Sequence, residues 1–404
     1  MTQTPVVPTA TESLVARTRV VGPTDLFAQL GLDGFAWLRD GVGFVAGGTA
    51  ARVRVDAVAD ALGRITVADD VRGRGTGAIA VGHLPFVIPS DATLTIPAWV
   101  MGRTADGTHW RTDIAVDDLA VDDLAVPPRP AAGATTPGRL TRHELMDRVS
   151  WDRAVAAALD AIASDELVKV VLARAIRVDT ERPIDPAWLL RRLAAREPDR
   201  FLYACAGFVG ASPELLIRRT GPDITARPLA GTEPVTSEPA SVERLARSPK
   251  QRHEHEVVIA AITDTLRRWC RDVEAGAPEV TELPDVSHLV THVRAAALPE
   301  TPSALGLALA LHPTPAVGGE PRAAALELIR RSEPTPRGNY AGPVGWVDQH
   351  GDGEFAVALR GAQLSGTSAL VHAGAGIVAG SEPESEWIET TAKLEPILHA
   401  LTTT

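Results

Sequence analysis

The sequence predicts an α+β fold built mainly from antiparallel sheets. Strand-like and helix-like runs are mixed along the chain, and several pairs of strand-like runs are joined by short turn signals typical of hairpins. Of the 404 residues, 45% are hydrophobic, which is enough for a large core. We expect a β-rich N-terminal subdomain and linker over residues 1–138 and the main functional region over 139–404, integrated into one domain.

Composition narrows the class of protein. The net charge of −11 and the lack of a dense basic stretch argue against nucleic acid as a partner. No apolar run approaches the roughly 20 residues of a membrane span, and no signal peptide is evident at the N-terminus. Two cysteines are too few for a disulfide framework or a zinc site. We therefore expect a soluble cytoplasmic protein, and no feature requires more than a monomer.

The N-terminal third is predicted to be mostly strand. Residues 1–20 are expected to be a loose lead-in, and residues 34–48 form a hairpin with its turn at Asp40-Gly41. Further strands are predicted within 78–89 and 94–112. The short duplication AVDDLAVDDLAV at 115–126 indicates solvated acidic surface, and residues 127–138 have the composition of a linker.

The rest of the chain, after residue 138, is predicted to contain both helices and strands. Its predicted elements are a helix at 151–164, a strand at 169–178, two strands within 201–219 with a turn around Ser212-Pro213, a helix from Ser248 to Cys270, a helix at 321–331, a hairpin within 340–364 turning at 351–353, and a last strand and helix at 372–393. Ser248-Pro249 gives a cap and first residue for its helix, with Gln251 placed for a capping box.

Lysine is rare in this chain. Only Lys169, Lys250 and Lys393 are lysines among 40 basic residues. Arginine keeps its proton in a protein, whereas lysine can lose it when buried or placed near another cation. Each rare lysine is therefore a candidate for chemistry that arginine cannot perform, although solvated surface groups are the alternative.

The stretch 372–393 combines glycines with acidic residues. Gly374 and Gly376 fall in its strand-like part and would allow a backbone to approach a ligand closely. Glu386, Glu389 and Lys393 follow at spacings that place them on one face of a helix. Carboxylate oxygens one turn apart suit Mg²⁺ better than zinc. The alternative is a glycine-rich turn before a surface helix.

Several single residues also stand out. Arg360 is expected on the strand that starts at Glu354, on one face with the small Ala356 and Ala358, which leave room for a carboxylate ligand. An arginine on an edge strand that reaches solvent is the alternative. Glu254 points toward the packed face of its helix, where a cation would offset the cost of burial. His253 and His255 point apart, which excludes a shared zinc. Glu214 and His312, taken alone, favour structural roles.

Eight ordered stretches resemble the chorismate-utilising enzymes, a family that includes isochorismate synthases, salicylate synthases and the ammonia-using subunits of anthranilate and aminodeoxychorismate synthase. They are KVVLAR at 169–174, SPELL at 212–216, RPLAGT at 227–232, KQRHEHEVV at 250–258, HPTPAVGG at 312–319, YAGPVGW at 340–346, GDGEFAVALR at 351–360 and AGAGIVAGSEPESEWIETTAK at 373–393. Residues 1–140 resemble the family only loosely, and Glu233-Pro234 depart from its usual basic residues after AGT.

The resemblance implies two stacked antiparallel sheets flanked by helices, with a chorismate cleft in the C-terminal half. It implies Mg²⁺ held by Glu254, Glu386 and Glu389, a general base at Lys169 and a general acid at Glu214. The substrate-binding residues that it implies are Gly231, Thr232, His312, Tyr340, Arg360, Gly374, Gly376 and Lys393.

Lys169 favours water over ammonia as the nucleophile, because many ammonia-using members carry another residue there. The resemblance therefore implies an isochorismate synthase. A salicylate synthase and a non-catalytic chorismate-binding homologue are the alternatives, and the destination of the product, menaquinone or siderophore, is left open. Lys250 has no assigned role beyond the start of its helix.

Overall fold

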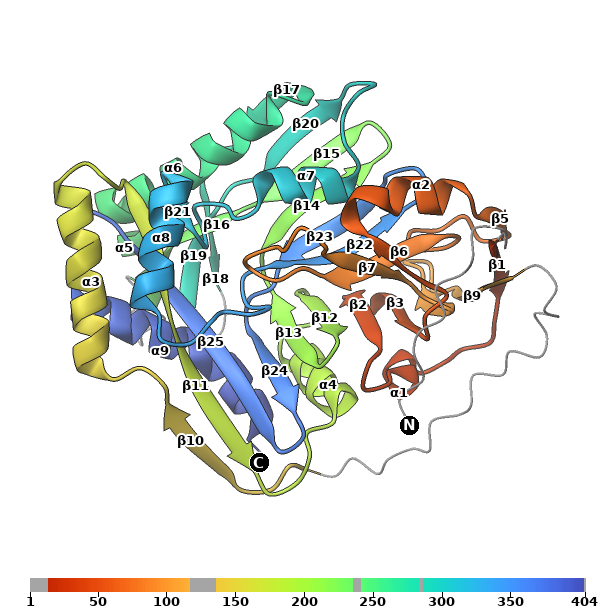
Figure 1. Cartoon of the computed structure of the whole chain (residues 1–404), viewed down its shortest axis with the longest axis horizontal. Helices are drawn as coiled ribbons and strands as arrows, with labels where there is room; N and C mark the ends of the chain where they lie inside the picture. The colour runs from red at the N-terminus through yellow and green to blue at the C-terminus, as the bar shows by residue number, and fades with distance from the viewer. Residues whose placement is uncertain (1–13, 117–135, 235–240, 283–285, 403–404) are drawn as a thin grey trace.

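The computed structural model describes residues 14–116, 136–234, 241–282 and 286–402 (Figure 1). Part of the acidic duplication at 115–126 and most of the linker at 127–138 lie outside these residues. Within them, no helix is both long enough and apolar enough to span a membrane.

The larger sheet contains strands from both ends of the chain. Its order is β10 (Leu140–Glu144), β11 (Lys169–Thr180), β25 (Ser368–Ile377), β24 (Gly361–Ser365), β13 (Phe208–Ser212), β12 (Phe201–Cys205), β2 (Phe35–Arg39), β3 (Val42–Gly47), β8 (Trp99–Arg103), β9 (His109–Val116), β1 (Leu14–Val20) and β5 (Thr66–Asp69), with β21 (Gly319–Glu320) paired to β11. Its pairings are antiparallel apart from that of β1 with β5.

The second sheet also mixes early and late strands. Its order is β17 (Cys270–Ala275), β20 (Val293–Ala297), β15 (Asp223–Arg227), β14 (Leu215–Thr220), β23 (Gly353–Val357), β22 (Pro343–Asp348), β6 (Ile79–His83), β7 (Thr93–Ile96) and β4 (Ala51–Arg54). A small third sheet joins β16 (Leu229–Pro234), β19 (Val286–Val290) and β18 (Glu279–Glu282). Strands from residues 14–116 therefore complete both large sheets.

The two large sheets stack face to face across a shared core. Alternate residues of each strand point to opposite faces, so Trp37 faces this core while Leu38 faces outward to a second apolar layer. Phe44 and Trp346, from opposite sheets, pack edge to face with ring centroids 5.9 Å apart. Trp37 also donates a hydrogen bond of 2.9 Å to the buried Glu354 across the same interface. The expected α+β arrangement of stacked sheets is confirmed.

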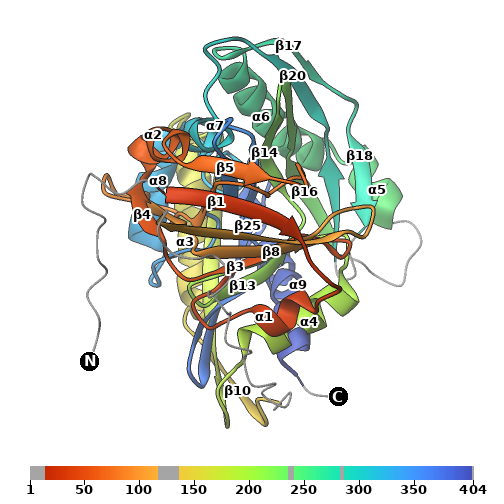
Figure 2. The same cartoon turned by 90° about the vertical axis from the view of Figure 1, so that its right-hand side faces the viewer.

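Helices cover the outer surfaces of this stack (Figures 1 and 2). Helix α9 (Pro383–Leu401) and α4 (Pro186–Arg196) contribute to the apolar layer on the outer face of the larger sheet. The other helices are α1 (Leu26–Gln29), α2 (Val58–Gly63), preceded by the 3₁₀ turn η1 (Val55–Ala57), α3 (Arg148–Ala163), α5 (Ser241–Arg247), α6 (Pro249–Leu266), α7 (Ala304–Leu311) and α8 (Arg322–Ser332).

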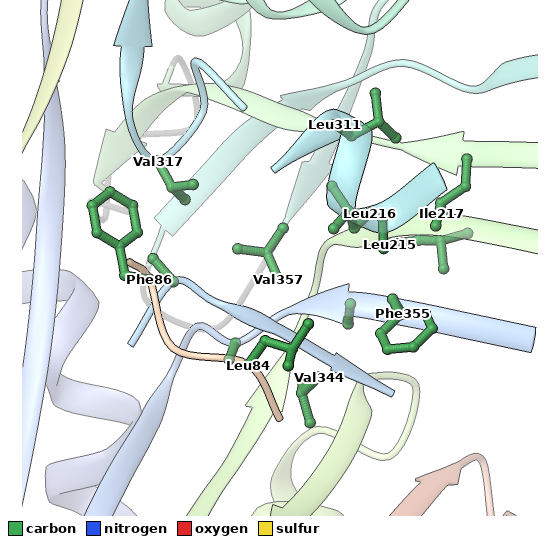
Figure 3. Close-up of a cluster of buried hydrophobic side chains, with 14 of the residues drawn as sticks. Leu84, Phe86, Leu215, Leu216, Ile217, Leu311, Val317, Val344, Phe355 and Val357 are labelled. Carbon is green, nitrogen blue, oxygen red and sulfur yellow. The ribbon is translucent and has the colours of Figure 1, made fainter. Parts of the chain in front are cut away.

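Figure 3 shows the part of the shared core beneath α7. Leu311 of α7 lies over Leu216 of β14, with Phe355 and Val357 of β23 in the layer below. Phe86, which follows β6, lies beside Val317 at the edge of this cluster. Val317 also lines the cavity described below, so the apolar core supports one wall of that cavity.

Most predicted elements are confirmed, with shifted ends. The Asp40-Gly41 turn joins β2 and β3, and both of its residues have positive φ angles, 52° and 72°. Ser248 caps α6 by accepting a hydrogen bond of 3.3 Å from the backbone N–H of Gln251. The reciprocal half of the predicted capping box is not made, because the side-chain oxygen of Gln251 accepts from the backbone N–H of Thr232 instead.

Three local predictions were wrong. The expected lead-in contains β1, which is ordered by pairing with β9 and β5. Residues 201–219 form three strands, because a tight turn at Ala206-Gly207 separates β12 from β13. Arg360 does not lie on a strand as predicted. Strand β23 stops at Val357, and Arg360 lies in the following loop with a φ of 50°.

Candidate active site

A partly enclosed cavity lies where the larger sheet, the small third sheet and helices α6 and α9 meet. Six of the eight motifs supply its charged and polar side chains, apart from His288 and His372. Among its lining residues are Glu214, Thr232, Glu254, Tyr340, Arg360, Gly374, Gly376 and Lys393, together with His288, His372 and the apolar Val171, Leu229, Val317 and Leu359. Most of the residues predicted from the sequence are therefore brought together.

The glycines of β25 make room for charged side chains. A Cβ atom added at Gly376 would lie 2.1 Å from a carboxylate oxygen of Glu254 and 3.1 Å from Cε of Lys169. At Gly374 an added Cβ would lie 3.2 Å from the Tyr340 hydroxyl. The strand therefore needs glycine at residue 376 for a close approach of protein side chains, whereas the expected approach of this backbone to a ligand stays a prediction.

We expect Gly376→Ala to reduce turnover by roughly 10²-fold, because displacing Glu254 and Lys169 by about 1 Å disturbs the reacting geometry. Steady-state kinetics with a thermal melt would measure this. Gly63→Ala is the control, since nothing lies within 4 Å of a Cβ atom there. Near-normal kinetics in Gly376→Ala would show that the close approach does not matter.

Lys169 and Glu254 form a buried ion pair. Lys169 begins β11, its side chain is fully buried, and its ammonium nitrogen lies 2.8 Å from a carboxylate oxygen of Glu254 on α6. Burial opposes the ionisation of Glu254, but Lys169, with help from Lys393 and Lys250, lowers the pKa of this carboxyl. The ammonium of Lys169 has no further hydrogen-bond partner among the described residues, which leaves donor capacity for a ligand.

Glu214 is a second buried carboxyl, and its pKa is shifted in the opposite direction to that of Glu254. It lies in the turn between β13 and β14 and is 2% exposed. Burial raises its pKa to about 8, although the positive charge of Lys169 opposes the rise. Glu214 is therefore mostly protonated at neutral pH, while Glu254 is ionised. The two carboxyl groups are suited to different tasks.

Two further carboxylates lie on the first turns of α9. Glu386 and Glu389 are both buried. The ammonium of Lys250 lies 2.6 Å from Glu386, and that of Lys393 lies 2.5 Å from Glu389. Burial raises the pKa of Glu389 to about 7, and Glu386 and Glu254 add to the rise while Lys393 opposes it. Each of the three predicted metal ligands is thus paired with one of the chain's three lysines.

The donor set suits a hard cation, though the carboxylates do not converge as they stand. Across the described ranges, no three His, Cys, Asp or Glu side chains are grouped so that they could hold a metal. Glu254, Glu386 and Glu389 nevertheless sense one another's charge, since two of them raise the pKa of the third. Three neighbouring buried carboxylates supply oxygen donors of the kind that Mg²⁺ prefers, so their chemistry suits this ion although their present arrangement does not hold it.

One part of the cavity wall is basic and aromatic. A guanidinium nitrogen of Arg360 lies 3.2 Å from Nε2 of His288, whose Nδ1 lies 3.1 Å from the Thr232 hydroxyl. Arginine can only donate, so Nε2 of His288 accepts and Nδ1 carries the proton. Burial first, then the charges of Lys393 and Arg360, hold the pKa of His288 well below its usual range. His288 is therefore neutral and links two predicted substrate-binding residues.

Tyr340 completes this wall with a partner that sequence reasoning missed. Its ring stacks on His372 at a centroid distance of 5.2 Å. His372 is buried, lowering its pKa to about 4, and its Nε2 has no hydrogen-bond partner among the described residues. No sequence signal distinguished His372 or His288 from core histidines, because their roles depend on contacts with distant strands.

Some predicted residues lie near the cavity without lining it. His312 is not part of the cavity wall, and its Nε2 lies 2.9 Å from the Phe86 carbonyl oxygen. Gly231, with a φ of 77°, is not part of the wall, although its neighbours Ala230 and Thr232 are. Lys169, Glu386 and Glu389 do not line the cavity, although Lys169 pairs with Glu254 and Glu389 pairs with Lys393, which do. Glu386 pairs with Lys250, which does not line it either.

Comparison with known proteins identifies the family of this site. A family model described as chorismate binding enzyme matches residues 90–402. The chain is 39% identical over 345 residues to a putative isochorismate synthase MenF of Mycobacterium tuberculosis, covering 81% of this chain and 87% of that protein.

Solved structures are similar over nearly the whole chain. The menaquinone-specific isochorismate synthase MenF of Escherichia coli matches with a TM-score of 0.83 and 26% identity, covering 97% of this chain and 96% of that one. A putative 2,3-dihydroxybenzoate-specific isochorismate synthase, DhbC, of Bacillus anthracis matches with a TM-score of 0.77 and 29% identity, covering 93% of this chain and 98% of that one.

Proposed function

The chain belongs to the chorismate-binding enzyme family, and we propose that it is an isochorismate synthase, an isomerase that converts chorismate to isochorismate. The observation that carries this proposal is the placement of Glu214, Glu254 and most of the predicted chorismate-binding residues around one cavity, with Lys169 paired to Glu254. The similarity to proteins named isochorismate synthases supports it.

The reaction adds water at C2 of chorismate while the C4 hydroxyl departs and the ring double bonds shift. A base must take a proton from the water, and an acid must protonate the leaving hydroxyl. Glu214 suits the acid, because burial keeps it protonated near neutral pH. We assign the base to Lys169, because its side chain lies beside Glu254 and Gly376, which both line the cavity. A lysine acts as base only after losing its proton.

The other side chains bind and orient the substrate. Arg360 offers a planar pair of donors to a carboxylate of chorismate, and His288 fixes the orientation of its guanidinium. Tyr340 and the backbone at Gly374 lie on the same wall. Val171, Leu229 and Leu359 supply apolar surface against the ring and exclude water from it.

We further propose that Glu254, Glu386 and Glu389 hold Mg²⁺. When bound, this ion would neutralise the ring carboxylate of chorismate and fix its position. The three buried carboxylates and their mutual repulsion support the assignment.

Glu389→Gln tests this metal site. Losing one charged oxygen donor should raise the half-saturating Mg²⁺ concentration by roughly tenfold or more. Titrating activity with Mg²⁺ measures the shift, and Glu384→Gln on the same helix is the control because its side chain is 63% exposed. An unchanged Mg²⁺ titration in Glu389→Gln would contradict the assignment.

Identifying the product tests the proposed function. Purified protein incubated with chorismate and Mg²⁺ should yield isochorismate by chromatography, with no salicylate or pyruvate. Salicylate with pyruvate would instead identify a salicylate synthase, which forms the same intermediate and then eliminates pyruvate. Tight chorismate binding with no turnover would indicate a non-catalytic homologue. An aminated product formed only with ammonia would contradict all three.

The destination of the product is a separate question. Relatives include a menaquinone-specific enzyme and a putative 2,3-dihydroxybenzoate-specific one. We propose that isochorismate from this enzyme enters menaquinone or siderophore synthesis, and the genes beside its own would distinguish the two.

A further inference from the structure

Lys250 is the one lysine that neither the sequence nor the proposed mechanism gives a task, yet it lies against a proposed metal ligand. Its ammonium nitrogen lies 2.6 Å from an oxygen of Glu386. Glu386 is 2% exposed, so its charge is almost fully removed from water and depends on a neighbouring cation. Lys250 supplies that cation from the first turn of α6, an element distant in sequence from α9.

The three lysine–glutamate pairs differ in how firmly the lysine is held. Lys169 is completely buried within β11, which fixes its ammonium beside Glu254. Lys393 is held twice, by Glu389 on its own helix and by a hydrogen bond of 3.0 Å to the Gly374 carbonyl oxygen. Lys250 donates to Glu386 alone among the described residues, and 27% of its side chain is exposed.

The side chain of Lys250 is therefore free to move into solvent, because, in the part of the chain that the structure describes, only its contact with Glu386 holds it. It is the second residue of α6, and its flexible side chain can swing into solvent without moving the helix. Glu386 has no such freedom, because it is buried in the first turns of α9. A divalent cation approaching Glu386 meets an oxygen already occupied by an ammonium group. One of these two cations must yield.

We propose that Lys250 competes with Mg²⁺ for the Glu386 carboxylate, so that this lysine sets the affinity of the enzyme for its metal. The inference rests on the proposed function of the carboxylates as metal ligands. Before the metal arrives, Lys250 offsets the repulsion among Glu254, Glu386 and Glu389. On metal binding its ammonium moves to solvent, and the cost of breaking this ion pair weakens the apparent binding of Mg²⁺.

Isothermal titration with Mg²⁺ alone, without substrate, tests the competition. Lys250→Gln should bind Mg²⁺ on the order of tenfold more tightly than the wild type, because no ion pair has to be broken. Lys250→Arg keeps the charge and should stay close to the wild type. Arg252→Gln removes one exposed charge from the same helix and should change the affinity little, which controls for general electrostatics.

Thermal melts give an independent readout. Without Mg²⁺, Lys250→Gln should melt at a lower temperature than the wild type, because Glu386 keeps its burial and loses its cation. Saturating Mg²⁺ should raise the melting temperature of this variant more than that of the wild type, as tighter binding to the folded state requires.

Two results would overturn the inference. Equal or weaker Mg²⁺ binding by Lys250→Gln would show that Lys250 does not compete, and weaker binding would mean that it orients Glu386 for the metal. Absence of Mg²⁺ binding by the wild type would overturn both this inference and the metal assignment. Isochorismate synthesis is judged separately, from the product formed by the wild type.

Discussion

Replacing Lys169 by alanine is expected to lower kcat by roughly 10²–10⁴-fold, the usual contribution of a general base. Chorismate should still bind, because Arg360 and Thr232 contact the cavity from other elements. Kinetics of isochorismate formation and equilibrium binding of chorismate measure the two effects. Near-normal turnover would refute the role of Lys169 as base.

Charge and base catalysis must be separated, because Lys169 also neutralises Glu254. Lys169→Arg keeps a cation beside Glu254 but cannot release its proton. We expect Lys169→Arg to be as inactive as Lys169→Ala. Its melting temperature should lie closer to that of the wild type than the melting temperature of Lys169→Ala does, because the ion pair with Glu254 is retained. Recovery of activity by arginine would mean that Lys169 acts only through its charge.

Glu214→Gln should lower kcat by a comparable factor, roughly 10²–10⁴-fold, because the amide cannot protonate the departing hydroxyl. It preserves size and polarity at a site that is 2% exposed, so the fold should tolerate it. The pH dependence of the wild-type kinetics provides a second test of Glu214 as the acid.

The pH dependence follows from the raised pKa of Glu214, about 8, which burial causes. An acid catalyst works only when protonated, so kcat/KM should fall as the pH rises through about 8. The residual rate of Glu214→Gln should lack this limb. A wild-type profile that stays flat between neutral pH and pH well above 8, or a variant that retains the limb, would contradict the role of Glu214 as the acid.

Local signals predicted the parts of the fold that depend on neighbours in sequence. Ser248 and Pro249 marked the start of α6, and Asp40-Gly41 marked the first hairpin. The three local errors have two causes, positive φ angles and pairing between strands distant in sequence. The turn at Ala206 uses a positive φ of 48° on a residue that carries no turn signal, and β1 is ordered by its partner strands. Arg360 leaves its strand because the loop before β24 takes a positive φ.

The candidate site was predicted largely through the resemblance to a family, since its residues come from distant elements. Glu254, Arg360 and Gly376 are brought to one cavity by α6, the loop after β23, and β25. The pairing of all three lysines with the three carboxylates was not predicted, although the scarcity of lysine was noticed. Rarity identified the residues, but only the tertiary structure shows what each one contacts.

The central claim is that this protein forms isochorismate by adding water to chorismate. Running the wild-type reaction in oxygen-18 water with Mg²⁺ and analysing the product by mass spectrometry tests it most directly. We predict isochorismate carrying one oxygen-18 atom in its new hydroxyl group, with no salicylate or pyruvate. Unlabelled isochorismate, which would mean that the hydroxyl moves within the substrate, or salicylate with pyruvate as the product, would contradict the claim.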